Sequence, residues 1–116
     1  MGAYRALPTR HSHDRRAERF VPHSIFEELC TSAASFHGHG SVRYRVVRHG
    51  NAFWIAPLRD GCVLTVYCVV GAGINAWAAG HLRNPDQTRH RLLNMAGHVT
   101  TEERITQELA RLWLEA

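Results

Sequence analysis

The residues of this chain best suited to chemistry are a histidine and two arginines near its start. His11, Arg15 and Arg19 are spaced four apart within residues 10–20. On an α-helix such residues stand nearly above one another, so the three side chains would form one row. An imidazole can exchange a proton near neutral pH, and guanidinium groups hold phosphate through paired donors. The row suits an anionic phosphodiester, although a solvated basic helix face with no chemical role shows the same spacing.

The charge of the chain points to the same region. All 14 basic residues are arginine, and with ten acidic residues they give a net charge of +4. Residues 1–48 hold eight Arg and four acids, whereas residues 49–116 hold six of each, so the whole excess is N-terminal. We expect a polyanionic partner to bind there. General electrostatic attraction is the role expected of four further arginines: Arg16, Arg43, Arg45 and Arg48.

Cysteines and histidines give little sign of a metal site or a cofactor. Cys30, Cys62 and Cys68 lack the close pairs of a zinc or redox motif, and we expect buried, reduced thiols. The two His-x-His pairs, at residues 11–13 and 37–39, come without the acidic or Cys partners of a closed metal site. The sequence therefore predicts no metal and no cofactor.

The length of 116 residues suits a single domain, residues 1–116. No apolar run approaches the ~18 residues that a membrane span requires, and the first residues lack the apolar segment of a secretory signal. We expect a cytoplasmic protein that does not contact the membrane.

The elements that must position the row begin with two helices. Thr9 can cap a helix over residues 10–20, and Ser24 opens a second helix, to about residue 32, with a capping box. Residues 33–41, rich in Gly and His, are expected to form a loop.

Period-two alternation follows from Val42. It predicts one strand from there, a second over 52–58 and a third over 62–70, which is almost wholly apolar and so is expected to be the central one. Thr65 and Tyr67, two apart on the third strand, should share a face.

The remaining segments are a short strand over 74–79, a helix from Pro85 to about Gly97, and a last helix capped at Thr100. The order predicts an α+β fold in which N-terminal helices pack on a three- or four-stranded antiparallel sheet, with C-terminal helices. The expected core includes Leu29, Val46, Ile55, Leu64 and Val66.

Two stretches resemble a known family. The segment from Thr9 to Leu29 and the later Arg-Asp-Gly-Cys-Val-Leu-Thr-Val-Tyr, residues 59–67, are similar to parts of a small bacterial family with a His-x3-Arg-x3-Arg helix. That family is grouped with the barnase, EndoU, colicin and RelE (BECR) type of ribonuclease toxins. Here Ser12 stands where a small Ala is usual and Phe20 where Gly is usual. Residues 9–70 would form the toxin-like core, and 71–116 a C-terminal extension.

The resemblance implies N-terminal helices on a curved antiparallel sheet and RNA cleavage without a metal. It places the catalytic site on five residues: His11, Arg15, Arg19, Thr65 and Tyr67. His11 would exchange protons, the two arginines would hold the phosphate, Thr65 would donate a hydrogen bond to it, and Tyr67 would be a second proton donor or stack on a base. RNA, an antitoxin or immunity protein, and a second copy in a homodimer are the partners to consider.

Two other classes of function stay open. The same basic face would serve a non-catalytic mobile-element or phage protein that binds nucleic acid or inhibits a nucleic-acid enzyme. A structural adaptor would instead use the apolar stripe of its last helix. Each residue of the proposed site also has an alternative: His11 simply caps or packs, Thr65 is present for its β propensity, and Tyr67 is an ordinary sheet aromatic.

Overall fold

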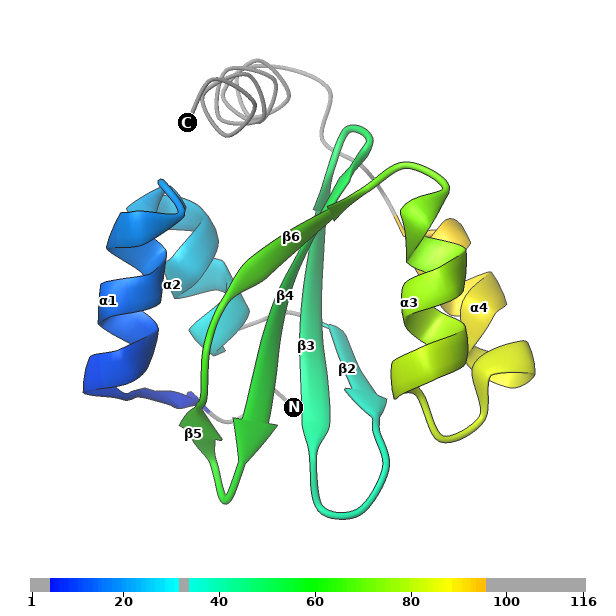
Figure 1. Cartoon of the computed structure of the whole chain (residues 1–116), viewed down its shortest axis with the longest axis horizontal. Coiled ribbons are helices and arrows are strands. Elements are labelled where there is room, and N and C mark those ends of the chain that lie inside the picture. The colour runs from blue at the N-terminus through cyan, green and yellow to red at the C-terminus, as the bar shows by residue number, and fades with distance from the viewer. Residues whose placement is uncertain (1–4, 32–33, 96–116) are drawn as a thin grey trace.

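The computed structural model describes residues 5–31 and 34–95 (Figure 1). The last predicted helix, from Thr100, lies outside the described residues. Helices flank a single sheet, so the predicted α+β class is confirmed. The elements in chain order are β1 (Leu7–Pro8), α1 (Arg10–Glu18), α2 (His23–Thr31), β2 (Ala34–His37), β3 (Arg43–His49), β4 (Ala52–Arg59), β5 (Cys62–Val63), β6 (Tyr67–Val70), α3 (Gly73–His81) and α4 (Pro85–Leu93).

Within residues 5–31 and 34–95 the sheet has six strands and is mixed, which corrects the prediction of three or four antiparallel strands. Its order is β1-β5-β4-β3-β2, and β6 also pairs with β4. β1 runs parallel to β5, whereas the other pairs are antiparallel. β2 is additional and lies in the segment expected to be a loop. β1 is an edge strand that ends at Pro8, in the first eight residues, for which a loose arm or an edge strand is expected, and the predicted strand 62–70 forms both β5 and β6. Short strands at the sheet edges carry too few residues to show alternation in sequence.

The predicted third strand, 62–70, is divided into β5 and β6 by a bulge. Leu58 of β4 pairs with Val63, and Ile55 pairs with Tyr67. Two residues of β4 between these pairs therefore face three residues, Leu64–Val66, on the other side. One extra residue of this kind interrupts the ladder and turns the strand. The central strand is β4, buried from Ala52 to Leu58, rather than 62–70 as predicted.

The bulge also explains one error in the predicted core. Leu64 lies in it and is only half-buried, so its assignment to the core was wrong. The other four predicted core residues are buried: Leu29, Val46, Ile55 and Val66.

Helices cover both faces of the sheet and make three layers. Residues of α2 pack with Val47 and Trp54 on one face, and residues of α3 and α4 pack with Val46 and Phe53 on the other. Figure 1 shows α1 and α2 on one side of the strands and α3 and α4 on the other.

The first helix is tied to the sheet at its start. The Thr9 hydroxyl accepts a hydrogen bond from the Ser12 amide at 3.1 Å and donates one to the Val63 carbonyl at 2.7 Å. The predicted Thr9 cap is confirmed. The Thr9 amide in turn donates a hydrogen bond to the Ser12 hydroxyl, which completes a capping box. This anchoring places the start of α1 beside β5, which leads into the bulge that contains Thr65 and then into β6, which begins at Tyr67.

The segment 74–79 belongs to α3 and is not a strand. Its buried residues Ile74, Trp77 and Ala78 recur at helical spacing and face the sheet. The helix predicted from Pro85 is present as α4. Within the described residues, none of the helices has the length and apolar character that a membrane crossing requires.

Candidate functional site

His11 and Arg15 lie on α1, whereas Arg19 is the C-cap residue that follows its last residue, Glu18, so the helix predicted over 10–20 ends sooner than expected. The three side chains also differ in their contacts. His11 is exposed, and its Nε2 lies 3.4 Å from Nε of Arg15, a marginal hydrogen bond. Arg15 also forms an ion pair with Glu18 one turn further along. The guanidinium of Arg15 is thus flanked by an imidazole and a carboxylate, and Glu18 offsets part of the positive charge that a phosphate would meet.

Arg19 connects the row to the sheet. Its Nη1 donates to the Val66 carbonyl at 2.7 Å and lies 3.4 Å from Oγ1 of Thr65. Both acceptors belong to the bulge between β5 and β6, where the ladder to β4 is interrupted and a carbonyl needs another donor. The bulge therefore brings Arg19 and Thr65 together.

Tyr67 follows the bulge as the first residue of β6. Its hydroxyl accepts a hydrogen bond from Nε1 of Trp77 at 2.8 Å, and the ring packs with the α3 side of the core. Burial raises the pKa of Tyr67, an effect that the Trp77 hydrogen bond and the charge of Arg19 oppose. The phenol consequently stays protonated at neutral pH and could donate a proton or a hydrogen bond.

An aromatic group on α3 continues the site beyond Tyr67. Trp77 stacks on His81 with ring centroids 5.2 Å apart, and the ring of Tyr44 meets Trp77 edge-on at 5.1 Å. His81 is exposed, so this group ends in an accessible imidazole face.

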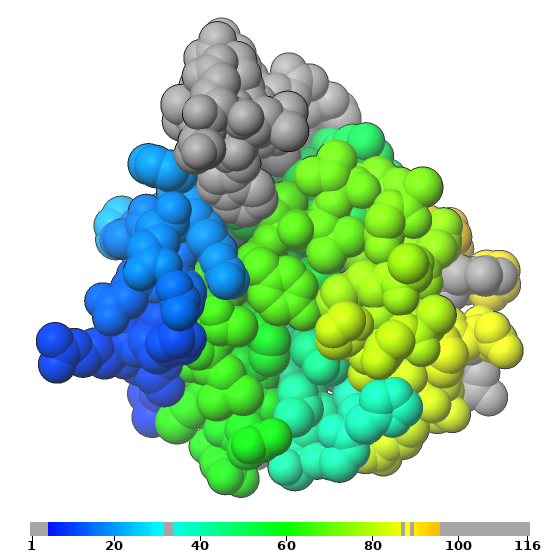
Figure 2. Space-filling model, in the orientation of Figure 1, coloured from blue at the N-terminus to red at the C-terminus, as the bar shows by residue number. Residues whose placement is uncertain are grey.

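The site lies along one edge of the sheet rather than on a sheet face. Helices cover both faces, but Figure 2 shows the green surface around β6 between the blue α1 and the yellow-green α3. An RNA strand could reach the row on α1 and the residues of the bulge from this side. Among the predicted catalytic residues, His11 contacts Arg15 and Arg19 contacts Thr65, while the hydroxyl of Tyr67 contacts Trp77.

Phe20 is a candidate that the sequence reasoning passed over. It follows Arg19, is 49% exposed, and has a φ of +54°, a conformation that glycine usually supplies at a helix end. Its amide donates to the Ala17 carbonyl and that of Val21 to the Arg16 carbonyl, a Schellman motif. The signal was Phe in the position where the resembling family has Gly. An exposed ring beside an arginine is suited to stacking on a base.

The four arginines expected to attract RNA have different surroundings. Arg43 is exposed and donates to Nε2 of His37 at 3.0 Å, while Arg16 donates to the Val21 carbonyl at 3.2 Å. Arg48 donates to the carbonyls of Gly50 and Leu93, which ties β3 to the end of α4.

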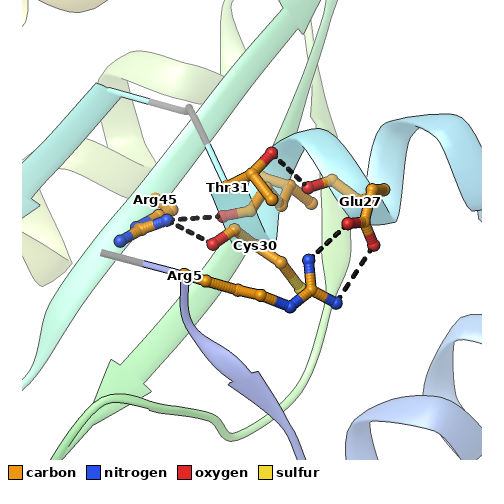
Figure 3. Close-up of polar contacts among 6 residues, drawn as sticks. Arg5, Glu27, Cys30, Thr31 and Arg45 are labelled. Carbon is orange, nitrogen blue, oxygen red and sulfur yellow. Dashed lines mark hydrogen bonds and ion pairs between the residues drawn. The ribbon is translucent and has the colours of Figure 1, made fainter. Parts of the chain in front are cut away.

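Arg45 is buried, with 5% of its surface exposed. Its Nη1 donates to the carbonyls of Cys30 at 2.6 Å and Leu29 at 3.3 Å, as Figure 3 shows. It thus satisfies carbonyls in the last turn of α2, which lack partners within the helix. Arg45 therefore does not belong to an exposed basic surface of the kind expected for general electrostatic attraction, which corrects the expectation for this residue.

The cysteines are free thiols, but only Cys30 is fully buried. Cys62 and Cys68 are half-buried, which corrects the expectation for those two. Burial raises the pKa of Cys68 to about 12, so its thiol is protonated and a poor nucleophile at neutral pH.

Among the described residues, no group of three or more His, Cys, Asp and Glu side chains is placed to hold a metal ion. Comparison of the chain with protein-family models gave no match, and comparisons with curated proteins and with solved structures gave none either. The function is therefore inferred from the residues, their arrangement and the resemblance of short motifs.

Proposed function

We propose that this protein binds RNA along α1 and the β6 edge and cleaves it without a metal ion. His11 would act as general base or acid at the ribose 2′-hydroxyl or the leaving oxygen. Arg15 and Arg19 would stabilise the charge that develops on the phosphate, and Thr65 would donate a hydrogen bond to it. The protonated Tyr67 would be the second proton donor, and Phe20 would stack on an adjacent base.

One observation carries this proposal: Arg19 reaches from α1 to the bulge. Its contacts with Val66 and Thr65 join the helical row to the segment that precedes Tyr67. Two parts of the chain far apart in sequence, both named by the resemblance, thereby meet at one edge of the sheet. A phosphate beside Arg19 could contact the helix and the bulge together.

The test is cleavage of total RNA by the purified protein in excess EDTA, comparing wild type with His11→Ala. Loss of a general acid or base should lower the rate about 10²- to 10⁴-fold, while the dissociation constant for RNA stays nearly unchanged. His23→Ala is the matched control, since His23 is also exposed at the start of a helix. Equal cleavage by wild type and His11→Ala would exclude His11 as the catalyst.

A second candidate function is RNA binding without catalysis, as in a mobile-element or phage protein. Among the described residues, the one hydrogen bond of His11 is with Arg15, and no carboxylate orients its ring. Catalytic histidines are commonly held by such a partner. RNA binding without cleavage by the wild type would favour this function.

A further inference from the structure

A pocket of about 180 Å³ lies on the sheet apart from the row on α1. None of the residues that line it belongs to the proposed catalytic group. Its polar lining consists of three arginines, two serines and one aspartate: Arg5, Arg43, Arg45, Ser35, Ser41 and Asp60.

The pocket is assembled from separate segments of the chain. Arg5 precedes β1, Ser35 lies on β2, and Arg45 lies opposite Ser35 on β3. Ser41 comes from the β2–β3 connection, and Asp60 from the tight turn after β4. Pairing of β2 with β3 fixes the positions of Ser35 and Arg45 relative to each other, so the fold holds these polar groups in place.

The charge of the lining is predominantly positive, with three guanidinium groups and one carboxylate. Arg5 forms an ion pair with Glu27, an exposed residue of α2 (Figure 3). Arg43 donates to His37, and Arg45 to the carbonyls at the end of α2.

Arg43 and Arg45 are two residues apart on β3, so their side chains lie on the same face of the sheet, and both line the pocket. Burial lowers the pKa of Arg45, Cys30 raises it, and the charge of Arg43 lowers it by a smaller amount. An anion in the pocket would offset part of the positive charge of the lining, and the serine hydroxyls could donate to its oxygens.

We propose that this pocket binds a tetrahedral phosphate dianion, either free inorganic phosphate or the terminal phosphate monoester of an RNA. A volume of about 180 Å³ admits a phosphate group but is below the roughly 300–1,000 Å³ of sites that enclose a whole small molecule. Arginine forks and hydroxyl donors are the groups that recognise tetrahedral anions. The proposal does not depend on RNA cleavage, because His11 and its row take no part.

Thermal unfolding of the full chain tests the binding, in potassium phosphate against potassium chloride at equal ionic strength. Phosphate should raise the Tm of the wild type by about 5 °C when it is well above its dissociation constant. Arg43→Gln should lose most of this shift, while its Tm in chloride stays close to that of wild type because Arg43 is exposed. Arg59→Gln, an exposed arginine outside the lining, removes the same charge and should keep the shift.

A second measurement distinguishes the two sources of phosphate. The dissociation constants of a short RNA with a 5′-phosphate and of the same RNA with a 5′-hydroxyl are compared for wild type and Arg43→Gln. If wild type binds the 5′-phosphorylated RNA at least fivefold more tightly than the 5′-hydroxyl RNA, and Arg43→Gln loses this difference, the pocket binds RNA ends. If wild type binds the two RNAs equally but still shows the Tm shift in phosphate, the pocket binds free phosphate. A Tm shift as large in Arg43→Gln as in wild type, or none in wild type, would overturn the proposal, whatever the result for His11→Ala.

Discussion

At the scale of single residues, arginines that look equivalent in the sequence have different roles in the structure. Arg19 bridges a helix and a strand bulge, whereas Arg45 satisfies carbonyls inside the protein. A guanidinium reaches several acceptors through its fixed fork, so its task depends on which acceptors the fold brings near. Charge counts alone do not separate these cases.

Replacement of Arg45 by Met should expose its structural task. Met keeps much of the buried volume but leaves the Leu29 and Cys30 carbonyls without this donor, at a cost of about 1.5–3 kcal/mol in the free energy of unfolding. Urea denaturation monitored by Trp fluorescence measures it. Arg59→Met, at an exposed position, should stay within about 0.5 kcal/mol of wild type. An Arg45→Met protein as stable as wild type would show that these bonds contribute no net stability.

At the scale of elements, the end of α1 combines a structural cost with a candidate binding group. A non-glycine residue in the left-handed conformation is strained, typically by about 1 kcal/mol or more, yet Phe20 occupies that position with its ring exposed. Strain of this kind can be retained where the side chain has a function.

Phe20→Gly should therefore weaken RNA binding without lowering the free energy of unfolding. We expect the free energy of unfolding to stay the same or rise by up to about 1 kcal/mol, because Gly relieves the strain but has a more flexible unfolded state. Loss of a stacked base should weaken RNA binding by about 1–3 kcal/mol. Chemical denaturation and fluorescence anisotropy measure the two effects. Unchanged RNA affinity in Phe20→Gly would remove Phe20 from the binding surface.

At the scale of the whole molecule, helices cover both faces of the sheet, so the RNA that we propose as a partner would have to bind at an edge. The family resemblance implies N-terminal helices on an antiparallel sheet, and α3 and α4 cover the second face with Trp77 and Leu92 buried. A flexible single strand fits a narrow edge site better than a rigid duplex does.

The salt dependence of RNA binding tests this arrangement. Each phosphate contact on a single strand contributes about 0.7 to the slope of log K against log salt, so Arg15→Gln with Arg19→Gln should reduce its magnitude by about 1.4. The double variant Arg59→Gln with Arg83→Gln loses the same charge away from α1 and should change the slope much less. Equal slopes for the two double variants would indicate that RNA binds elsewhere.

The elements predicted correctly are those governed by local patterns. The Thr9 cap and the spacing of His11, Arg15 and Arg19 depend on neighbours within one or two helical turns, so α1 could be predicted from the sequence. The existence of α2 was predicted too, although it begins at His23, so Ser24 lies inside it and is not its cap. The strands around Val46 and Ile55 and the helix that begins at Pro85 were also predicted, and these elements together determine the α+β class.

Tertiary structure alone decided the features that depend on distant partners. The bulge at residues 64–66 arises from the register with β4, which placed Leu64 outside the core and Arg19 beside Val66. The apolar segment 74–79 became a helix because its buried side covers a sheet face, and composition does not distinguish that outcome from a strand. Arg45 is buried because α2 ends above it, a contact between segments that no local pattern encodes.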